Sequence, residues 1–150
     1  MSERDEVQTL VDRFCKDHGF TKKSGSWYRR QDETIAVLNL QRSQHSNAYY
    51  LNVALWLLAL GEAAAPKEHT CHVRTRADRL VVDGEALNKA LDLEHSEAER
   101  GAVIVDALTT TDDLLRACSS LAGCRRSPGR LFVERALVRG QAQELIVNDS

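Results

Sequence analysis

Aromatic, arginine and amide side chains recur between residues 28 and 76 at positions where they could form a binding surface. Rigid aromatic rings supply contact area, while guanidinium and amide groups supply directional hydrogen bonds. This combination is typical of a surface that recognises another molecule. The candidate partner-binding residues are Tyr28, Arg30, Asn39, Gln41, Tyr50, Asn52, Trp56, Arg74 and Arg76.

Two other uses of the same residues remain open. The aromatic rings could stack on bases while Arg30, Arg74 and Arg76 hold phosphates, as in modules that bind RNA or nucleotides, with Lys22 and Lys23 at the flank. Alternatively, the amides satisfy one another on a half-exposed sheet face and the aromatic rings only cover that face. Amides within a strand need hydrogen-bond partners when they are buried.

Two stretches of the sequence predict the strands that would carry these side chains. Residues 34–42 and 49–57 are rich in β-branched, aromatic and aliphatic side chains, and the polar segment 43–48 joins them. Such an arrangement favours adjacent antiparallel strands. One face of the pair would then be wholly apolar, with Ala36, Leu38, Leu40, Leu51, Val53 and Leu55.

The register of this pair decides which residues share a face. If Arg42 pairs with Tyr49, Asn39 lies opposite Asn52 on the face away from the apolar residues, because paired residues in antiparallel strands point to the same side. A tight turn at residues 32–33 would add a preceding strand, with Tyr28 and Arg30 on the polar face and Trp27 on the apolar face.

A helix, a strand meander and a second set of helices are expected in that order. The first helix is predicted over Glu3–His18, with Ser2 as its N-cap and Gly19 ending it. Strands follow from residue 20 to 60, and residues 70–76 predict a last strand at the sheet edge. This order indicates an α+β fold: an N-terminal helix, an antiparallel β-meander of about four to five strands, and C-terminal helices packed on one sheet face.

Capping residues predict where the C-terminal helices begin. Asp83 would cap a helix over residues 85–93, and Ser96 with Glu99 forms a capping box before the next helix. The three threonines at 109–111 should interrupt that helix. A final helix is expected from Pro128 through Leu145, although its apolar run could also be a strand.

Sequence signatures of common enzymes are missing from the chain. It has no GxGxxG, GxxxxGK followed by Ser or Thr, HExxH or GxSxG motif, so a standard enzyme is disfavoured. A site around His72, Arg74, Tyr28 and Gln41 would need those groups to converge. We expect no catalytic residue and no cofactor.

The cysteines and histidines give no metal-binding pattern. Neither CxxC nor a paired Cys and His spacing occurs, so no metal ligands are expected. Reduced thiols are expected for Cys15, Cys71, Cys118 and Cys124, two of which, Cys15 and Cys118, lie on apolar helical faces.

Length and composition favour one soluble domain spanning residues 1–150. The chain has 28% charged and 43% hydrophobic residues and a formal net charge of −2. The absence of a basic balance disfavours nucleic acid as the partner. No apolar run reaches the roughly 18 to 20 residues that span a bilayer, and the N-terminal residues do not form a signal peptide, so no membrane partner and a cytoplasmic location are expected.

Several short motifs resemble a family of small bacterial domains of unknown function. That family has a GFxKK…FYR…NLQ+S…FYxN pattern, and residues 19–23, 27–29, 38–43 and 49–53 match it. The stretch His72–Arg76 is similar to a later HxRxR element. The resemblance covers about Val7 to Arg76 and assigns no catalytic residue.

The resemblance implies a function in protein binding. Small bacterial domains of this kind often occur beside toxins as their immunity proteins, which bind and neutralise a cognate toxin domain of the contact-dependent or polymorphic type. A nuclease is one candidate for that toxin. Either the polar sheet face or an acidic helical edge would cover the toxin's active site, and a basic nuclease would favour the acidic edge.

Overall fold

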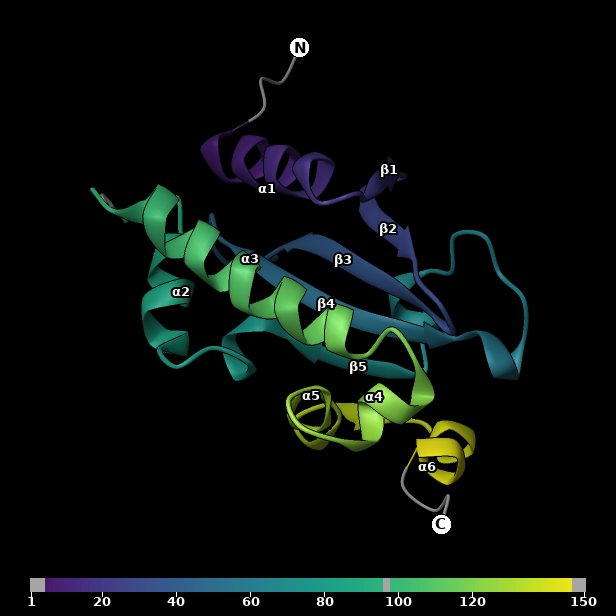
Figure 1. The fold of residues 1–150 in the computed structure, drawn as a ribbon. Coiled ribbons are helices and arrows are strands. Elements are labelled where there is room, and N and C mark those ends of the chain that lie inside the picture. Colours follow the sequence, from purple (N-terminus) through teal and green to yellow (C-terminus); the bar gives the residue numbers. More distant parts are fainter. Residues whose placement is uncertain (1–4, 96–97, 147–150) are drawn as a thin grey trace.

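The computed structural model describes residues 5–95 and 98–146 and confirms the α+β fold, with six strands instead of the four or five expected. Figure 1 shows α1 and α3 on one side of the antiparallel sheet. The strands, in their order across the sheet, are β1 (Thr21–Lys23), β2 (Ser26–Arg30), β3 (Thr34–Arg42), β4 (Tyr49–Leu57), β5 (Val73–Arg76) and β6 (Leu137–Val138). The helices are α1 (Glu6–Asp17), α2 (Gly84–Ala90), α3 (Arg100–Ala117), α4 (Leu121–Arg125), α5 (Gly129–Glu134) and α6 (Gly140–Ile146). Short 3-10 helices cover Leu58–Leu60, Glu68–Thr70 and Ala77–Arg79.

Helix α1 begins at a capping box formed by Asp5 and Gln8. The Asp5 carboxylate accepts a hydrogen bond from the Gln8 backbone N–H at 2.8 Å, and the Gln8 side chain accepts one from the Asp5 N–H. The helix therefore starts at Glu6, later than the expected start at Glu3. The expected cap, Ser2, lies outside the described residues.

Left-handed residues make the two sharp turns that surround β1. Gly19 has a φ of 84°, which confirms the predicted end of the first helix. Ser24 and Gly25 have φ values of 52° and 84° and join β1 to β2 in a two-residue hairpin turn. Because this turn is tight, Thr21–Lys23 pairs with β2 and becomes a strand.

The predicted register of β3 and β4 is confirmed. Arg42 pairs with Tyr49 and Asn39 pairs with Asn52. Strand β2 continues the same alternation, so Trp27 lies on the apolar face and is only 2% exposed.

The main core lies between this apolar face and the helices. Leu38, Val53 and Leu55 are fully buried there. Burial of one such side chain stabilises the fold by about 1.5 to 3 kcal/mol. From the helices, the core receives Val7, Val11, Phe14, Ile104, Leu108 and Leu115.

Strand β5 does not form the sheet edge, which corrects the expectation for residues 70–76. Val138 pairs with Val73, so β6 covers β5. The expected final helix from Pro128 to Leu145 is likewise wrong, because the chain leaves α5 at Glu134, runs as β6 and turns into α6. Periodicity could not separate helix from strand in this short apolar run.

Helix α3 passes through residues 109–111 without a break, contrary to the prediction. The Thr109 hydroxyl donates to the Val105 carbonyl of its own helix at 2.8 Å, and Thr111 is fully buried against the core. Tertiary packing thus outweighs the low helix propensity of threonine. None of the described helices is long and apolar enough to cross a membrane.

The other expected helix starts have mixed outcomes. Asp83 caps α2 as predicted, because its carboxylate accepts a hydrogen bond from the Ala86 N–H at 3.0 Å. Helix α3 begins at Arg100, while Ser96 of the expected capping box lies outside the described residues.

The second face of the sheet is covered at one end. Residues 58–72 leave β4 and fold back over that face, where the 3-10 helix Glu68–Thr70 contacts β3 and β4. A small second core forms beneath them, made of Ile35, Val37, Ala54 and Cys71 with Tyr28, Trp56 and Leu58 packed against it. The expected polar face is therefore polar only at its other end.

Candidate functional site

Two of the expected site residues lie under or beside the covering segment 58–72. The Trp56 indole N–H donates to the Gly61 carbonyl at 2.7 Å, and its ring centroid lies 4.2 Å from that of His72. Arg30 forms an exposed ion pair with Glu62 at 3.3 Å. These contacts occupy both side chains with neighbours in the fold.

The other expected residues gather at an open groove on the uncovered end of the second face. Two adjoining cavities of about 620 and 370 Å³ form it, and they share Gln41, Asn52, Glu68 and Arg74. Tyr50 lies beside the groove. The first cavity is also lined by Lys23, Ser24, Ser26, Tyr28, Asn39, Ala65, Lys67 and His69, and the second by Thr75, Arg76, Asp78, Arg79 and Leu137.

A ladder of amides on β3 and β4, joined to the Ser26 hydroxyl on β2, forms the floor of the groove. The Asn52 Nδ2 group donates to Asn39 Oδ1 at 3.1 Å and to Gln41 Oε1 at 3.0 Å. Asn39 Nδ2 in turn donates to Ser26 Oγ at 2.9 Å. The amides do satisfy one another, and the same bonds fix their orientation under the groove.

The covering segment supplies one wall of the groove. Glu68 accepts hydrogen bonds from Arg74 Nε at 3.1 Å and from Nη2 at 3.4 Å. The Glu68 side chain is 12% exposed, so this pair ties the wall to β5. Lys67 and His69 are exposed on its rim.

Positive charge remains uncompensated along the groove. Within the described part of the chain, Lys23, Lys67, Arg76 and Arg79 form no ion pair with a carboxylate. Arg76 lies over the Tyr50 ring, with its guanidinium carbon 3.9 Å from the centroid. A cation held on an aromatic face remains available to an anion above it.

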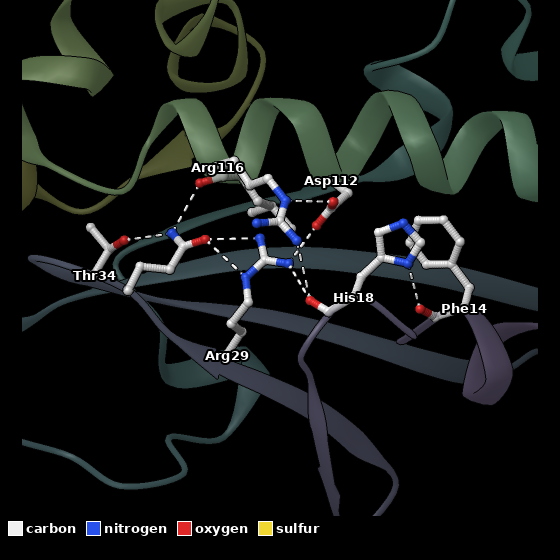
Figure 2. Close-up of polar contacts among 8 residues, drawn as sticks. Phe14, His18, Arg29, Thr34, Asp112 and Arg116 are labelled. Carbon is white, nitrogen blue, oxygen red and sulfur yellow. Dashed lines mark hydrogen bonds and ion pairs between the residues drawn. The ribbon is translucent and has the colours of Figure 1, made fainter. Parts of the chain in front are cut away.

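A second polar cluster is buried between α1, β2 and α3, on the core side of the sheet. Figure 2 shows the Arg29 guanidinium between Asp112 and the carbonyl of His18. Arg29 Nη1 lies 2.6 Å from Asp112 Oδ1 and donates to the His18 oxygen at 2.9 Å. Arg116 contacts the other Asp112 oxygen at 2.8 Å.

Gln31 completes this cluster and connects it to the end of α3. Its Oε1 accepts from Arg29 Nη2 at 2.9 Å, and its Nε2 donates to Thr34 Oγ1 and the Leu115 carbonyl, both at 2.9 Å. The Thr34 hydroxyl donates to the Cys118 carbonyl at 2.8 Å. Since Arg29, Thr34 and Asp112 are buried or nearly so and these polar groups satisfy one another, the cluster joins elements of the fold.

The four residues of the alternative enzyme site around His72 do not all come together in the structure. Tyr28, Gln41 and Arg74 line the groove, but His72 is buried under the wall, where its Nδ1 accepts from the Leu57 N–H at 2.9 Å. Burial, and secondly the charge of Arg139, lowers the pKa of His72. The neutral imidazole therefore serves as a structural acceptor.

The cysteines are buried, and for two of them burial makes the thiol a weaker acid. All four are free and buried, and burial raises the pKa of Cys71 to about 12. Burial also raises the pKa of Cys15. Among the described residues, no group of His, Cys, Asp or Glu is arranged to hold a metal ion.

The sequence analysis did not include several residues that the fold brings to the groove and to the buried polar cluster. Lys67 and Glu68 come from the segment between the strands expected up to residue 60 and at residues 70–76, and nothing in its composition predicts that it folds back over the sheet. Arg29 and Asp112 could have been suspected, because Arg29 alternates with Trp27 onto the apolar face. A cation there requires a buried partner.

The fold and groove describe an α+β domain with a polar trough on one sheet face. Family comparison agrees with the resemblance seen in the motifs: a sequence profile of the DUF4304 family, a domain of unknown function, matches residues 11–120. The chain belongs to this family. The match extends past β5 to include α3 and Asp112. Neither a curated protein nor a solved structure matches the chain.

Proposed function

We propose that this chain is an immunity protein that binds a cognate bacterial toxin domain and blocks its activity through the groove. The observation that carries the proposal is the groove itself, with its hydrogen-bonded amide floor and cationic rim. Blocking a toxin requires a complementary surface and no chemistry of its own.

The rigidity of the groove supports a binding role. Asn39, Asn52 and Gln41 project from paired strands and are held by side-chain hydrogen bonds. Arg74 is fixed by Glu68, and Arg76 rests on Tyr50. Groups already ordered in the free protein lose little conformational entropy on binding, which favours affinity. Arginine and tyrosine are also the residue types that dominate interface energies.

The alternative of an RNA- or nucleotide-binding module receives less support from the same contacts. Stacking would use Tyr28, Tyr50 and Trp56, but Trp56 is occupied by Gly61 and His72. The expected phosphate ligands Arg30 and Arg74 are paired with glutamates. A protein partner therefore suits the groove better.

The test begins with the neighbouring gene, where we expect a secreted protein that ends in a toxin domain, and continues with that domain. We expect co-expression to restore growth of cells that produce the toxin domain, and titration calorimetry to give a dissociation constant of micromolar or below. The Arg76→Ala variant should bind at least about fivefold more weakly, as expected for an interface residue worth more than 1 kcal/mol. Arg130→Ala, on α5 away from the groove, is the matched control. Failure of the two purified proteins to associate at micromolar concentration would contradict the proposal.

A further inference from the structure

The groove runs across the strands of the sheet and has a definite length. Its lining extends from Lys23 in β1 to Leu137 in β6, and so crosses the whole six-stranded sheet. Adjacent strands lie about 4.8 Å apart, which gives a length of about 24 Å. An extended polypeptide rises about 3.3 Å per residue, so about seven residues of extended chain would fill the groove.

The charges along this length favour an anionic occupant. Lys23 and Lys67 line the first cavity, and Arg76 and Arg79 line the second. The lining also has two carboxylates: Glu68 pairs with Arg74, and Asp78 accepts a hydrogen bond from the Asn88 amide at 3.2 Å. The groove is therefore cationic on a chain whose formal net charge is −2. Complementary charge would accelerate association and set the orientation of a partner.

The floor distinguishes a peptide from a nucleic-acid backbone. Amide side chains carry both donors and acceptors, and so does a peptide backbone. A phosphodiester backbone offers acceptors only and carries one charge per about 3.4 Å of strand. The mixed donors and acceptors of the floor therefore match a peptide backbone better than a row of phosphates.

We infer that the groove binds an extended acidic segment of about seven residues from the partner protein. Carboxylates of that segment pair with Lys23 and Lys67 at one end and with Arg76 and Arg79 at the other. Its backbone meets the amide floor between them. The inference rests on the proposed function, since the toxin domain is the protein that would supply the segment.

A synthetic peptide tests the chemistry of the groove without the toxin. The probe is a decapeptide of alternating Glu and Thr, titrated into the ¹⁵N-labelled full chain at low salt. We expect chemical-shift changes concentrated on the side-chain amides of Asn39, Gln41 and Asn52. A Lys and Thr decapeptide of the same length should leave these signals unchanged.

Charge reversal at each end gives the matched variants. We expect Arg76→Glu with Arg79→Glu, and separately Lys23→Glu with Lys67→Glu, to weaken peptide binding by about tenfold or more, because each exposed pair becomes a repulsion. All four side chains are exposed, so these variants should fold. Arg130→Glu, on α5, should bind like the unmodified protein.

Three outcomes would overturn the inference. They are shift changes outside the groove or none at all, charge-reversal variants that bind the peptide as tightly as the unmodified protein, and tighter binding of a ten-residue oligothymidylate at the same amides. The last result would point to nucleic acid. If the toxin domain binds the charge-reversal variants as well as the unmodified chain, the groove inference fails while the immunity function stands. If the peptide binds as expected and the toxin domain does not associate, the function fails and the groove chemistry stands.

Discussion

Arg29 on β2 and Asp112 on α3 form an ion pair with an N–O distance of 2.6 Å, although 83 residues separate them in the chain. Their side chains are only 10% and 5% exposed. The pair connects the helical layer to the sheet, and Arg116 and Gln31 satisfy the remaining polar atoms of both partners. Removal of one partner from a buried ion pair is strongly destabilising, because the other charge then remains buried without compensation.

Loss of the Asp112 charge should therefore destabilise the protein severely. We expect Asp112→Asn to lower the free energy of unfolding by about 3 to 5 kcal/mol, because it leaves Arg29 buried beside a neutral amide. Asp113→Asn, at the next and exposed position of α3, should change it by less than about 0.5 kcal/mol. Urea unfolding followed by circular dichroism measures both. Equal stability of the two variants would mean that the cluster does not hold α3 on the sheet.

The N-cap of α1 provides a second test of how the helical layer is held. Asp5 caps the helix through Gln8 and accepts a hydrogen bond from the Tyr49 hydroxyl of β4. We expect Asp5→Ala to lower the free energy of unfolding by about 1 to 2 kcal/mol through loss of the cap. Asp17→Ala, at the exposed C-terminal end of the same helix, should be neutral or slightly stabilising, since a negative charge there opposes the helix dipole. The reverse order in thermal melts would contradict the assigned cap.

The sheet could be predicted from the sequence because side chains alternate strictly between the two faces of a strand, so that one pairing fixes all the others. Once Arg42 is paired with Tyr49, every residue of β3 and β4 is assigned to a face, and a slip of one residue would bring Asn39 into the core. The turn at Ser24 and Gly25 likewise has residue types that are typical of turns.

Elements that depend on distant partners could not be predicted in the same way. Whether the segment Leu137–Val138 continues a helix or becomes β6 depends on the free edge of β5, which local periodicity does not reveal. The candidate site was predicted only in part for the same reason. The amide floor follows from the alternation of side chains along β3 and β4, whereas the wall at Lys67 and Glu68 exists because residues 58–72 fold back and bury Cys71 against the sheet.

Protonation of His72 should make stability depend on pH. Its pKa in the folded state is lowered below the ordinary value of 6.5, first by burial and then by the charge of Arg139. The unfolded chain therefore binds more protons than the folded chain as the pH falls below about 6.5. The stabilisation is present above that pH and is lost as the pH falls, at a rate of at most about 1.4 kcal/mol per pH unit for one proton.

An asparagine at this position isolates the contribution of the imidazole. The Asn side-chain oxygen can accept the Leu57 N–H in place of His72 Nδ1, and it does not titrate. We expect His72→Asn to be less stable than the unmodified protein at pH 7.5, because the contact with Trp56 is lost, but to lose less stability between pH 7.5 and 5.5. His45→Gln, in the exposed turn between β3 and β4, should leave the pH dependence unchanged. Parallel urea titrations at the two pH values measure it, and an unchanged slope in His72→Asn would refute the assignment.

The amide ladder of the groove predicts which of two substitutions at Asn52 is the more destabilising. Asn52 is 6% exposed and donates to both Asn39 and Gln41. Asn52→Leu removes both donated hydrogen bonds, and we expect it to lower the free energy of unfolding by about 1 to 3 kcal/mol because Asn39 Oδ1 loses its donor. Asn52→Asp should lose less, since the neighbouring amides can rotate and donate to the new carboxylate while the Ser26 hydroxyl donates to Asn39.

An exposed glutamine provides the control for this comparison. Gln44→Leu, in the turn between β3 and β4, should change the unfolding free energy by no more than about 0.5 kcal/mol. This variant measures the general effect of adding an apolar side chain, which can then be subtracted from the effect of Asn52→Leu. Denaturant midpoints should therefore decrease in the order unmodified protein, Asn52→Asp, Asn52→Leu. If Asn52→Leu is as stable as the unmodified protein, the ladder contributes no stability and its amides are retained for what the groove binds. If Asn52→Asp is the less stable of the two, the amides cannot reorient, and the floor presents its donors and acceptors in one fixed arrangement.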